Sequence, residues 1–343
     1  MHIKIVFQVA ATYVGAVMGA GFASGQEIQQ FFANFGGSGL LGILISTVLF
    51  SLLGWIMIDL QRRWRISSYM EFFARLFGKT WGARMDVVIS LLLFIGMTAM
   101  MSGAGAVFQQ YFELSPWVGI FLTALVITIA LWFRSEGILW INSALIPLKF
   151  IFCLGIALWA ILFAEGIKGV DVEIVANPMI QNWVFSGILY VSFNLTLAMV
   201  VFASLGKEIQ KPGARIGAVF GGIALGVFAL VICMALLRFP EVRGYEIPMV
   251  AVAGRLGAWA GFFYVVVLWL AMLTAAIGNG FSLVNHMEKR YGFNYRYSII
   301  FLLLLVIPLS SVQFSFIVKT VYPLFGYLGL IFIPVLIWKY RKT

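Results

Sequence analysis

Charged side chains are scarce in this chain of 343 residues. They make up 10% of the sequence, against about 25% in an ordinary soluble protein, and the mean hydropathy is +1.02. A globule of this size needs more polar side chains to cover its surface, so the composition excludes a water-soluble fold. The apolar runs are continuous rather than alternating, which excludes a transmembrane β-barrel. No charged tail or linker is long enough to form a separate soluble domain.

Cysteine and histidine are scarce as well, with two of each. Cys153 and Cys233 both lie inside apolar runs and therefore indicate no disulfide framework. The apolar runs contain no cluster of histidine and glutamate of the kind that holds a catalytic metal. We therefore expect that the protein is not an enzyme and that it has no metal or other cofactor.

What the sequence does contain is a series of apolar runs, each long enough to cross a hydrocarbon core of about 30 Å. They predict an all-α polytopic membrane protein with ten transmembrane helices and the lipid bilayer as its surroundings. The predicted spans are residues 5–33, 39–60, 85–110, 116–133, 138–164, 184–206, 214–237, 257–285, 297–315 and 320–339.

The distribution of basic residues orients these spans. Ten spans place both termini on one side, and the segments on that side hold 17 of the 23 basic residues. Basic residues gather in cytoplasmic loops, so both termini are predicted in the cytoplasm of a bacterial cell, with the spans in its plasma membrane. The net charge of +10 is then a topology signal and not a sign of nucleic-acid binding. One alternative is a cleaved signal peptide ending near Ala20-Gly-Phe-Ala-Ser-Gly, which would leave nine spans.

Short sequence echoes recur at a nearly constant offset of about 180 residues and predict an internal repeat. Five spans lie in each half, 1–164 and 165–343, within a single membrane domain. Because five is odd, the second half enters the membrane from the opposite side, which gives a 5+5 inverted repeat. Secondary transporters with this architecture bind their substrate near the membrane midplane, between discontinuous helices. The echoes are Tyr13-Val14 with Tyr190-Val191, Phe22-Ala23-Ser24 with Phe202-Ala203-Ser204, and Thr98-Ala99 with Thr274-Ala275.

The first span carries four glycines within eleven residues, Gly15, Gly19, Gly21 and Gly25. Glycine lets the backbone leave the helical conformation, and opened backbone at membrane depth is tolerated where it lines a cavity or is buried in protein. A helix-packing face is the alternative, since Gly15-xxx-Gly19 is also a contact pattern. Polar residues follow at once, including Ser24, which favours an opened helix whose freed amides suit a carboxylate.

The repeat partner in span 6 concentrates polar side chains mid-membrane, at Ser192, Asn194 and Thr196. These side chains bind substrate in one interpretation and a neighbouring helix in the other. We predict that helices 1 and 6 are both discontinuous at these points.

Three short motifs carry a resemblance to a known group. Gly15-xxx-Gly19-x-Gly21 resembles the unwound first helix of the amino acid–polyamine–organocation (APC) superfamily. Leu273-Thr-Ala-Ala-Ile277 and Phe202-Ala-Ser204 resemble runs in helices 8 and 6 of its sodium-coupled relatives. Over nearly its full length the chain resembles the YkvI-type family of bacterial membrane proteins, classed as amino acid permeases. The resemblance implies a LeuT-type fold.

The resemblance also implies a set of site residues. It places the substrate carboxylate at the amides around Gly19, Ala20 and Gly21, beside Phe22 and Ser24. It places the substrate amino group near Ser192, Phe193, Asn194 and Thr196, with Tyr190 as an aromatic lid. The second sodium site of the sodium-coupled relatives maps to the carbonyls of Gly15, Met18 and Ala271 and the Thr274 hydroxyl. Ala275 departs from that site, because it cannot supply the second hydroxyl.

Two charged residues lie at membrane depth and are candidates for ion coupling. Lys149 is near the middle of span 5, about ten residues from either end, too far for its ammonium group to reach an interface. In proton-coupled APC relatives a lysine in this span occupies the space of the missing sodium ion. Glu27 follows the break in span 1 and is either a proton carrier or a solvated acid of the half-helix.

The sequence therefore predicts a secondary active transporter that is coupled to protons and moves a small amino acid or related amine. Two alternatives keep the same fold: a ligand sensor like the APC-like subunits of germinant receptors, and a sodium-coupled symporter. The expected partners are the small-molecule substrate and the bilayer.

Overall fold

The computed structural model describes residues 2–66, 69–133, 137–164, 177–205 and 209–343, and within them every regular element is helical. The first half contains α1 (His2–Val17), α2 (Ala20–Ala23), α3 (Gln26–Phe31), η1 (Ala33–Phe35), α4 (Gly37–Trp64), α5 (Tyr69–Phe77), α6 (Lys79–Phe112), α7 (Pro116–Trp132) and α8 (Gly137–Phe163). For residues 137–149 of α8 the description covers the backbone alone, so the prediction for Lys149 lies outside the described side chains.

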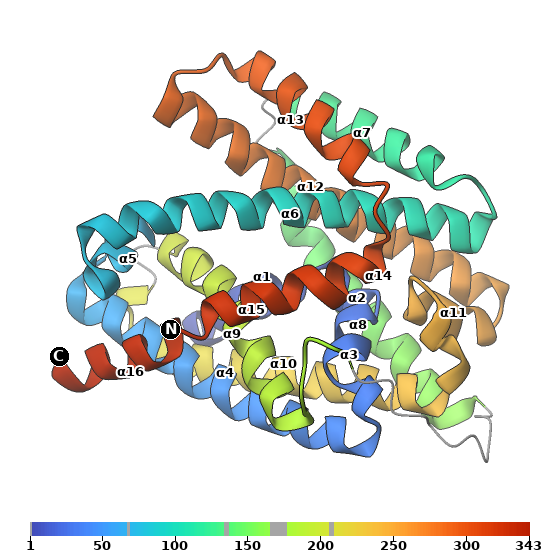
Figure 1. Cartoon of the computed structure of the whole chain (residues 1–343). Coiled ribbons are helices and arrows are strands. Elements are labelled where there is room, and N and C mark those ends of the chain that lie inside the picture. The colour runs from blue at the N-terminus through green and yellow to red at the C-terminus, as the bar shows by residue number, and fades with distance from the viewer. Residues whose placement is uncertain (1, 67–68, 134–136, 165–176, 206–208) are drawn as a thin grey trace.

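The second half begins with α9 (Trp183–Ser204), α10 (Ala214–Arg238), η3 (Pro240–Gly244), α11 (Pro248–Arg255), α12 (Ala258–Tyr291) and α13 (Tyr295–Leu309). It ends with α14 (Phe314–Phe316), the π-helical turn η4 (Ile317–Val321), α15 (Tyr322–Gly329) and α16 (Phe332–Lys342). Both termini and α5 lie at one end of the molecule and α11 lies at the other (Figure 1).

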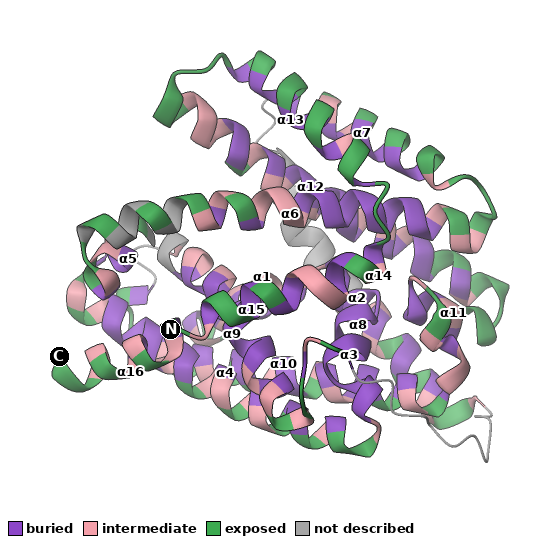
Figure 2. Ribbon diagram, viewed as in Figure 1, coloured by how far each residue is buried: buried purple, intermediate pink, exposed green. Residues whose placement is uncertain are grey.

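Within the described residues, six helices are long and apolar enough to cross a membrane, and four more apolar helices have 10–17 residues. Each predicted span coincides with at least one of them. The outer helices α7 and α13 have exposed faces (Figure 2), and these faces include the apolar residues Phe121, Leu125, Phe301 and Leu304, each more than half exposed. Such a surface is expected of helices that face lipid.

The helices pack in two groups. In one group α4 contacts α9 and α10, and α1 contacts α9 and α10. In the other group α6 contacts α7 and α12, α12 contacts α8 and α13, and α7 contacts α13. The broken segment α2–α3 touches both groups, because α2 contacts α6 and α12 while α3 contacts α9 and α10. The candidate site therefore lies between the two groups.

A salt-bridge network fastens the end of the molecule that carries the termini. The carboxylate of Asp59 is buried in α4 and lies 2.8 Å from Arg63 and 3.0 Å from Arg215 of α10. The Arg63 guanidinium stacks over the ring of Tyr340, 5.0 Å from its centroid, and that ring lies against Trp55. One buried acid thus connects α4, α10 and α16.

The structure differs from the predicted spans in three places. The prediction that helix 6 is discontinuous was wrong, because α9 is continuous from Trp183 to Ser204. The ninth predicted span runs too far, since α13 ends at Leu309 and residues 310–313 connect it to α14. The tenth predicted span lies within one helical run, Phe314–Lys342, which begins earlier than predicted and contains the π-helical turn η4.

The two halves share unusual joints. A glycine precedes each of the two 34-residue helices: Gly78 (φ 90°, ψ 161°) before α6 and Gly257 (φ 127°, ψ 161°) before α12. Each helix also ends at a left-handed residue, Glu113 (φ 57°) for α6 and Gly292 (φ 69°) for α12. Positive φ favours glycine, so these joints are specific sharp turns. In both halves the joint follows a short helix, α5 or α11.

The contact between α4 and α10 generates a stability prediction. A Cβ at Gly222 would stand 2.5 Å from the backbone nitrogen of Ser51, whereas a Cβ at Gly278 in α12 would meet nothing within 4 Å. We expect Gly222→Ala to lower the free energy of unfolding by about 1–3 kcal/mol through overpacking, although alanine is the better helix former. Gly278→Ala should be neutral or stabilising. Thermal unfolding of both variants in detergent, followed by tryptophan fluorescence, checks the contrast, and an equal melting temperature for the two would contradict it.

Candidate functional site

The first helix is interrupted twice, which confirms the predicted opening. α1 ends at Val17, α2 spans Ala20–Ala23, and α3 begins at Gln26. Gly25, between α2 and α3, has φ 82°, a conformation that favours glycine. In the described part of the chain the amides of Ala20, Gly21 and Phe22 donate to no carbonyl. The break therefore leaves a row of free backbone donors inside the membrane protein.

The carbonyls of Gly21, Ala23 and Ser24, at the second interruption, all accept hydrogen bonds. The Ser24 hydroxyl donates to the Gly21 carbonyl at 2.6 Å and accepts from the Gln26 amide at 3.1 Å. The Tyr264 hydroxyl of α12 donates to the Ala23 carbonyl at 2.6 Å. The Met249 amide of α11 donates to the Ser24 carbonyl at 3.0 Å. The carbonyls around Gly25 thus have partners, whereas the amides at the start of α2 have none among the described residues.

The Glu27 carboxylate lies against this break. A Cβ placed on Gly21 would stand 2.1 Å from Glu27 Oε1, so the missing side chain of Gly21 is what makes room for the acid. Glu27 Oε2 accepts a hydrogen bond from the Tyr190 hydroxyl of α9 at 3.2 Å. Glu27 is only 4% exposed, and among the described residues no basic side chain forms an ion pair with it. The site thus contains a buried acid with one tyrosine partner.

Aromatic rings surround that tyrosine. The ring of Tyr190 lies 5.1 Å from Phe31, 5.1 Å from Phe32 and 6.0 Å from Phe50, measured between centroids. These rings fix the direction of the hydroxyl toward Glu27. Tyr190 was predicted to be a lid; the structure places it beside the break, fully buried.

The polar residues of α9 are used mainly inside the protein. The Ser192 hydroxyl donates to the Gly326 carbonyl of α15, and the Asn194 amide donates to the Tyr190 carbonyl at 3.0 Å. Thr196 is buried. Since these groups find partners without any opening of the backbone, and no glycine lies among them, α9 stays helical. This is the physical reason that the predicted break in helix 6 is absent.

The Phe193 ring stacks on Tyr322, with 4.6 Å between centroids and 26° between planes. Tyr322 follows the π-helical turn η4, which contacts α3, and it is close enough to Glu27 for an electrostatic interaction. Neither Tyr322 nor Tyr264 was predicted as a site residue. The chain has 12 tyrosines, and no local pattern distinguishes these two. A π-helical turn, which often marks a functional site, leaves no sequence pattern here.

The residues predicted for ion coupling are partly brought together. On α12 the Thr274 hydroxyl donates to the Ala271 carbonyl at 3.2 Å. Ala275, the position that departs from the sodium-site pattern, follows on the same helix, which contacts α2. Gly15 lies in α1 and Met18 lies in the break. In the part of the chain that the structure describes, no group of three histidine, cysteine or acidic residues is arranged to hold a metal.

A cap formed by η3 and α11 closes the end of the site opposite the termini. Besides the Met249–Ser24 bond, Gln110 of α6 exchanges two hydrogen bonds of 2.9 Å with the backbone of Ile247. The Glu246 carboxylate accepts from the amide of Ser315 at 2.7 Å and from its hydroxyl at 2.6 Å. The cap is thus fastened to α2, α6 and α14.

The cap also holds α3. The Gln29 side chain donates to the Arg243 carbonyl at 2.8 Å, and the Arg243 guanidinium donates to the Ala33 carbonyl at 3.3 Å. Partial burial lowers the pKa of this guanidinium from its ordinary value, although an arginine keeps its charge near neutral pH.

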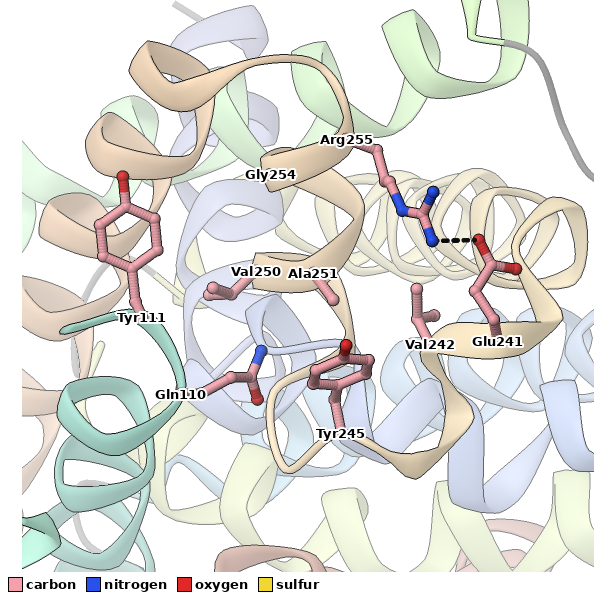
Figure 3. A pocket seen from close by; sticks show the side chains of 9 residues that line it. All are labelled: Gln110, Tyr111, Glu241, Val242, Tyr245, Val250, Ala251, Gly254 and Arg255. Carbon is pink, nitrogen blue, oxygen red and sulfur yellow. Dashed lines mark ion pairs between the residues drawn. The ribbon is translucent and has the colours of Figure 1, made fainter. Parts of the chain in front are cut away.

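A cavity of about 230 Å³ lies beside the cap (Figure 3). Its lining includes an ion pair of 3.4 Å between Arg255 and Glu241. It is separate from the Glu27 site, since none of the predicted site residues lines it. The lining residues are Gln110, Tyr111, Glu241, Val242, Tyr245, Val250, Ala251, Gly254 and Arg255.

Similarity to curated proteins extends over almost the whole chain. The uncharacterized membrane protein YkvI of Bacillus subtilis is 31% identical over 97% of this chain and 95% of its own length. The uncharacterized protein YyaD of the same organism is 29% identical over 92% of this chain and 91% of its own length. No family model matches the sequence.

Solved transporters share the fold at low sequence identity. A manganese transporter of Eremococcus coleocola is 15% identical, with a TM-score of 0.60 over 97% of this chain and 78% of its own. Mhp1, a nucleobase-cation-symport-1 family transporter, is 14% identical in its inward-facing form, with a TM-score of 0.63 over 94% of this chain and 73% of its own.

MhsT, solved in complex with L-phenylalanine, is 17% identical, with a TM-score of 0.64 over 94% of this chain and 87% of its own. The chain therefore has a LeuT-type transporter fold, as the resemblance implied. The agreement with transporters also fits the expectation that the protein is not an enzyme.

The cap generates a prediction about accessibility. Met249 is fully buried against Gly25, so a cysteine at this position reports cap opening once Cys153 and Cys233 are replaced by alanine. Glu246→Ala removes hydrogen bonds to a charged group, each worth about 1.5–3 kcal/mol. We expect a membrane-impermeant maleimide added outside cells to label Met249→Cys about 10- to 100-fold faster in the Glu246→Ala background.

Glu113→Gln, which changes an exposed acid at the end of α6, is the matched control and should leave the rate unchanged. Labelling only from the cytoplasmic side would show that the predicted orientation is inverted.

Proposed function

Because this chain belongs to the same family of membrane proteins as YkvI, we propose that it is a secondary active transporter, coupled to protons, that moves a small amino acid or related amine by alternating access. The plasma membrane of a bacterial cell, with both termini in the cytoplasm, is the proposed location. The solved relatives of this fold are transporters for chemically different cargo, namely manganese, nucleobase-type compounds and, in MhsT, a bound amino acid. The fold supports transport, and the choice of cargo rests on the site.

The single observation that carries the proposal is the buried Glu27 carboxylate in the broken first helix, hydrogen-bonded to Tyr190 of α9. A carboxyl group at this depth is costly to ionise unless a cation or a proton accompanies it. Glu27 lies in the segment α2–α3, which contacts both helix groups. Its protonation state therefore affects the contact between the two groups, which has to change during alternating access.

The proposed 5+5 inverted repeat has support beyond the sequence echoes. Gly257 follows Gly78 by 179 residues and Gly292 follows Glu113 by 179 residues, and each pair has the same sign of φ at corresponding helix ends. The two long helices that these joints bound have equal length. We infer that residues 1–164 and 165–343 are the two repeats of a single membrane domain.

Lys149 is proposed as a second coupling residue. Its position near the middle of α8, which contacts α10, α11 and α12, is compatible with a proton that moves during transport. The sodium-coupled alternative is weakened at Ala275, which offers no hydroxyl beside Thr274. A ligand sensor of the same fold would bind substrate and accumulate none.

Transport assays with purified protein in liposomes test the proposal. A mixed pool of amino acids and amines is offered under a pH gradient of either polarity or a sodium gradient. A difference of one pH unit across the membrane supplies about 1.36 kcal/mol for each proton that moves. It therefore limits the accumulation of substrate to about tenfold for each coupled proton. We expect accumulation with the pH gradient and not with sodium alone, and its loss in Glu27→Gln and in Lys149→Ala.

Glu113→Gln should accumulate substrate like the wild type. Accumulation driven by sodium would keep transport and overturn proton coupling. A Lys149→Ala variant that remained fully coupled would remove Lys149 from the mechanism. Equilibrium binding without accumulation under any gradient would favour the sensor.

A further inference from the structure

We propose that the substrate is an organic cation, an amine without a carboxylate, whose ammonium group pairs with Glu27 in exchange for a proton. This inference rests on the proposed function and narrows it from amino acids or amines to amines. It follows from what surrounds Glu27, from the position of its carboxylate against Gly21, and from the charges on the neighbouring elements.

The surroundings of Glu27 combine one acid with several aromatic rings. Its carboxylate accepts from Tyr190, whose ring is packed by Phe31 and Phe32. Tyr322, stacked on Phe193, interacts with it from the side of η4. A carboxylate supplies the counter-charge for an ammonium group, and aromatic faces attract cations by about 0.5–2 kcal/mol each. This combination of one acid and several rings favours an amine.

The position implied for a substrate carboxylate is already taken. The resemblance places that carboxylate at the amides of Ala20 and Gly21, yet Glu27 Oε1 lies over Gly21, where even a methyl group would be only 2.1 Å away. The backbone at Gly21 therefore already lies against a carboxylate that belongs to the protein. A substrate carboxylate brought to the same amides would meet a like charge in a site of low dielectric constant, which is strongly unfavourable.

The neighbouring elements provide no other counter-charge to Glu27. The elements packed against α3 are α2, η1, α9, α10, α11 and η4, and η3 is bonded to it through Gln29 and the Arg243 carbonyl. The Tyr190 hydroxyl donates to Glu27, and Tyr322 interacts with Glu27 electrostatically. The Arg243 guanidinium of η3 donates to the Ala33 carbonyl of η1. Arg215 of α10 pairs with Asp59 and Arg255 of α11 pairs with Glu241. In the described residues none of the basic side chains of these elements pairs with Glu27; the remaining two are Arg238 of α10 and Lys319 of η4.

Charge balance then fixes the mode of coupling. A buried carboxylate without a basic partner is neutralised either by a proton or by the ammonium group of the substrate, and one carboxylate cannot hold both as counter-charges. Binding of the amine therefore releases the proton, and protonation releases the amine. Coupling by this competition is exchange of a cation for a proton, so the gradient that drives accumulation has its acidic side inside.

Matched pairs of ligands test this inference. Each pair is an amino acid and the amine that remains when its carboxylate is removed: leucine and isoamylamine, phenylalanine and phenethylamine, ornithine and putrescine. Equilibrium binding is measured on the full-length protein in lipid nanodiscs by isothermal titration calorimetry. We expect at least one amine to bind at least about tenfold (1.4 kcal/mol) more tightly than its parent amino acid at pH 8. As the pH is lowered into the range where protons compete for Glu27, the affinity for the amine should fall about tenfold per pH unit.

Glu27→Gln should abolish both amine binding and its dependence on pH, whereas Glu113→Gln should change neither. Because Glu27→Gln can fail to fold, a second pair of variants repeats the test without removing the acid. Gly21→Ala displaces the Glu27 carboxylate and should weaken amine binding at least about tenfold. Gly278→Ala in α12, whose Cβ would meet nothing within 4 Å, should bind like the wild type.

Preference for the amino acid in every pair, or no binding of any amine by the wild type, overturns the inference. Its failure is distinguishable from failure of the proposed function. If amino acids accumulate under a pH gradient while amines do not bind, transport stands and the substrate class is wrong. If amines bind as expected but never accumulate under either polarity, the substrate class stands and transport is wrong.

Discussion

Backbone opened inside a membrane protein needs partners from the protein itself, because the bilayer offers none. The break in the first helix meets this requirement for the carbonyls of Gly21, Ala23 and Ser24 through Ser24, Tyr264 and Met249. The first amides of α2 have no partner among the described residues, and the Glu27 carboxylate lies against Gly21 beside them. The break and the Glu27 carboxylate together fix the position of α3 and the direction of the Tyr190 hydroxyl. They also fix the place where the cap bonds to the break, at Ser24.

The two ends of the molecule are held by different chemistry. At the end that carries the termini, a buried acid joins three helices through two arginines and their aromatic neighbours. At the opposite end, hydrogen bonds to backbone groups fasten the cap to α2, α6 and α14. The Met249–Ser24 hydrogen bond joins the cap to the same break that holds Glu27. Closure of the end opposite the termini and the environment of the acid therefore depend on one short segment of backbone.

Much of this arrangement could be predicted from the sequence. Hydropathy locates the helices because a span has to be continuously apolar, and the glycines of span 1 locate the break because they are concentrated where a plain helix would avoid them. The same argument failed for helix 6, where Ser192 and Asn194 suggested an opening. Their side chains bond to Gly326 and to the preceding turn instead, and a sequence does not reveal which partner a polar group finds. Tyr322 and Tyr264 could not be predicted for the same reason, since their roles come from the packing of α15 and α12 against distant elements.

The difference between the first helix and α9 has a consequence for selectivity. Since the first helix is broken into α1, α2 and α3 while α9 is continuous, the described backbone donors of the site come from the first half, and the second half contributes side chains. Those side chains are mostly aromatic, and each is held by another ring: Tyr190 by Phe31 and Phe32, Phe193 by Tyr322. In such a site the acid on the broken helix determines the charge of the ligand that binds. The rings on the continuous helices determine its shape. Substitutions among the rings should therefore change which cation is accepted, and substitutions at the break should change whether any cation is accepted at all.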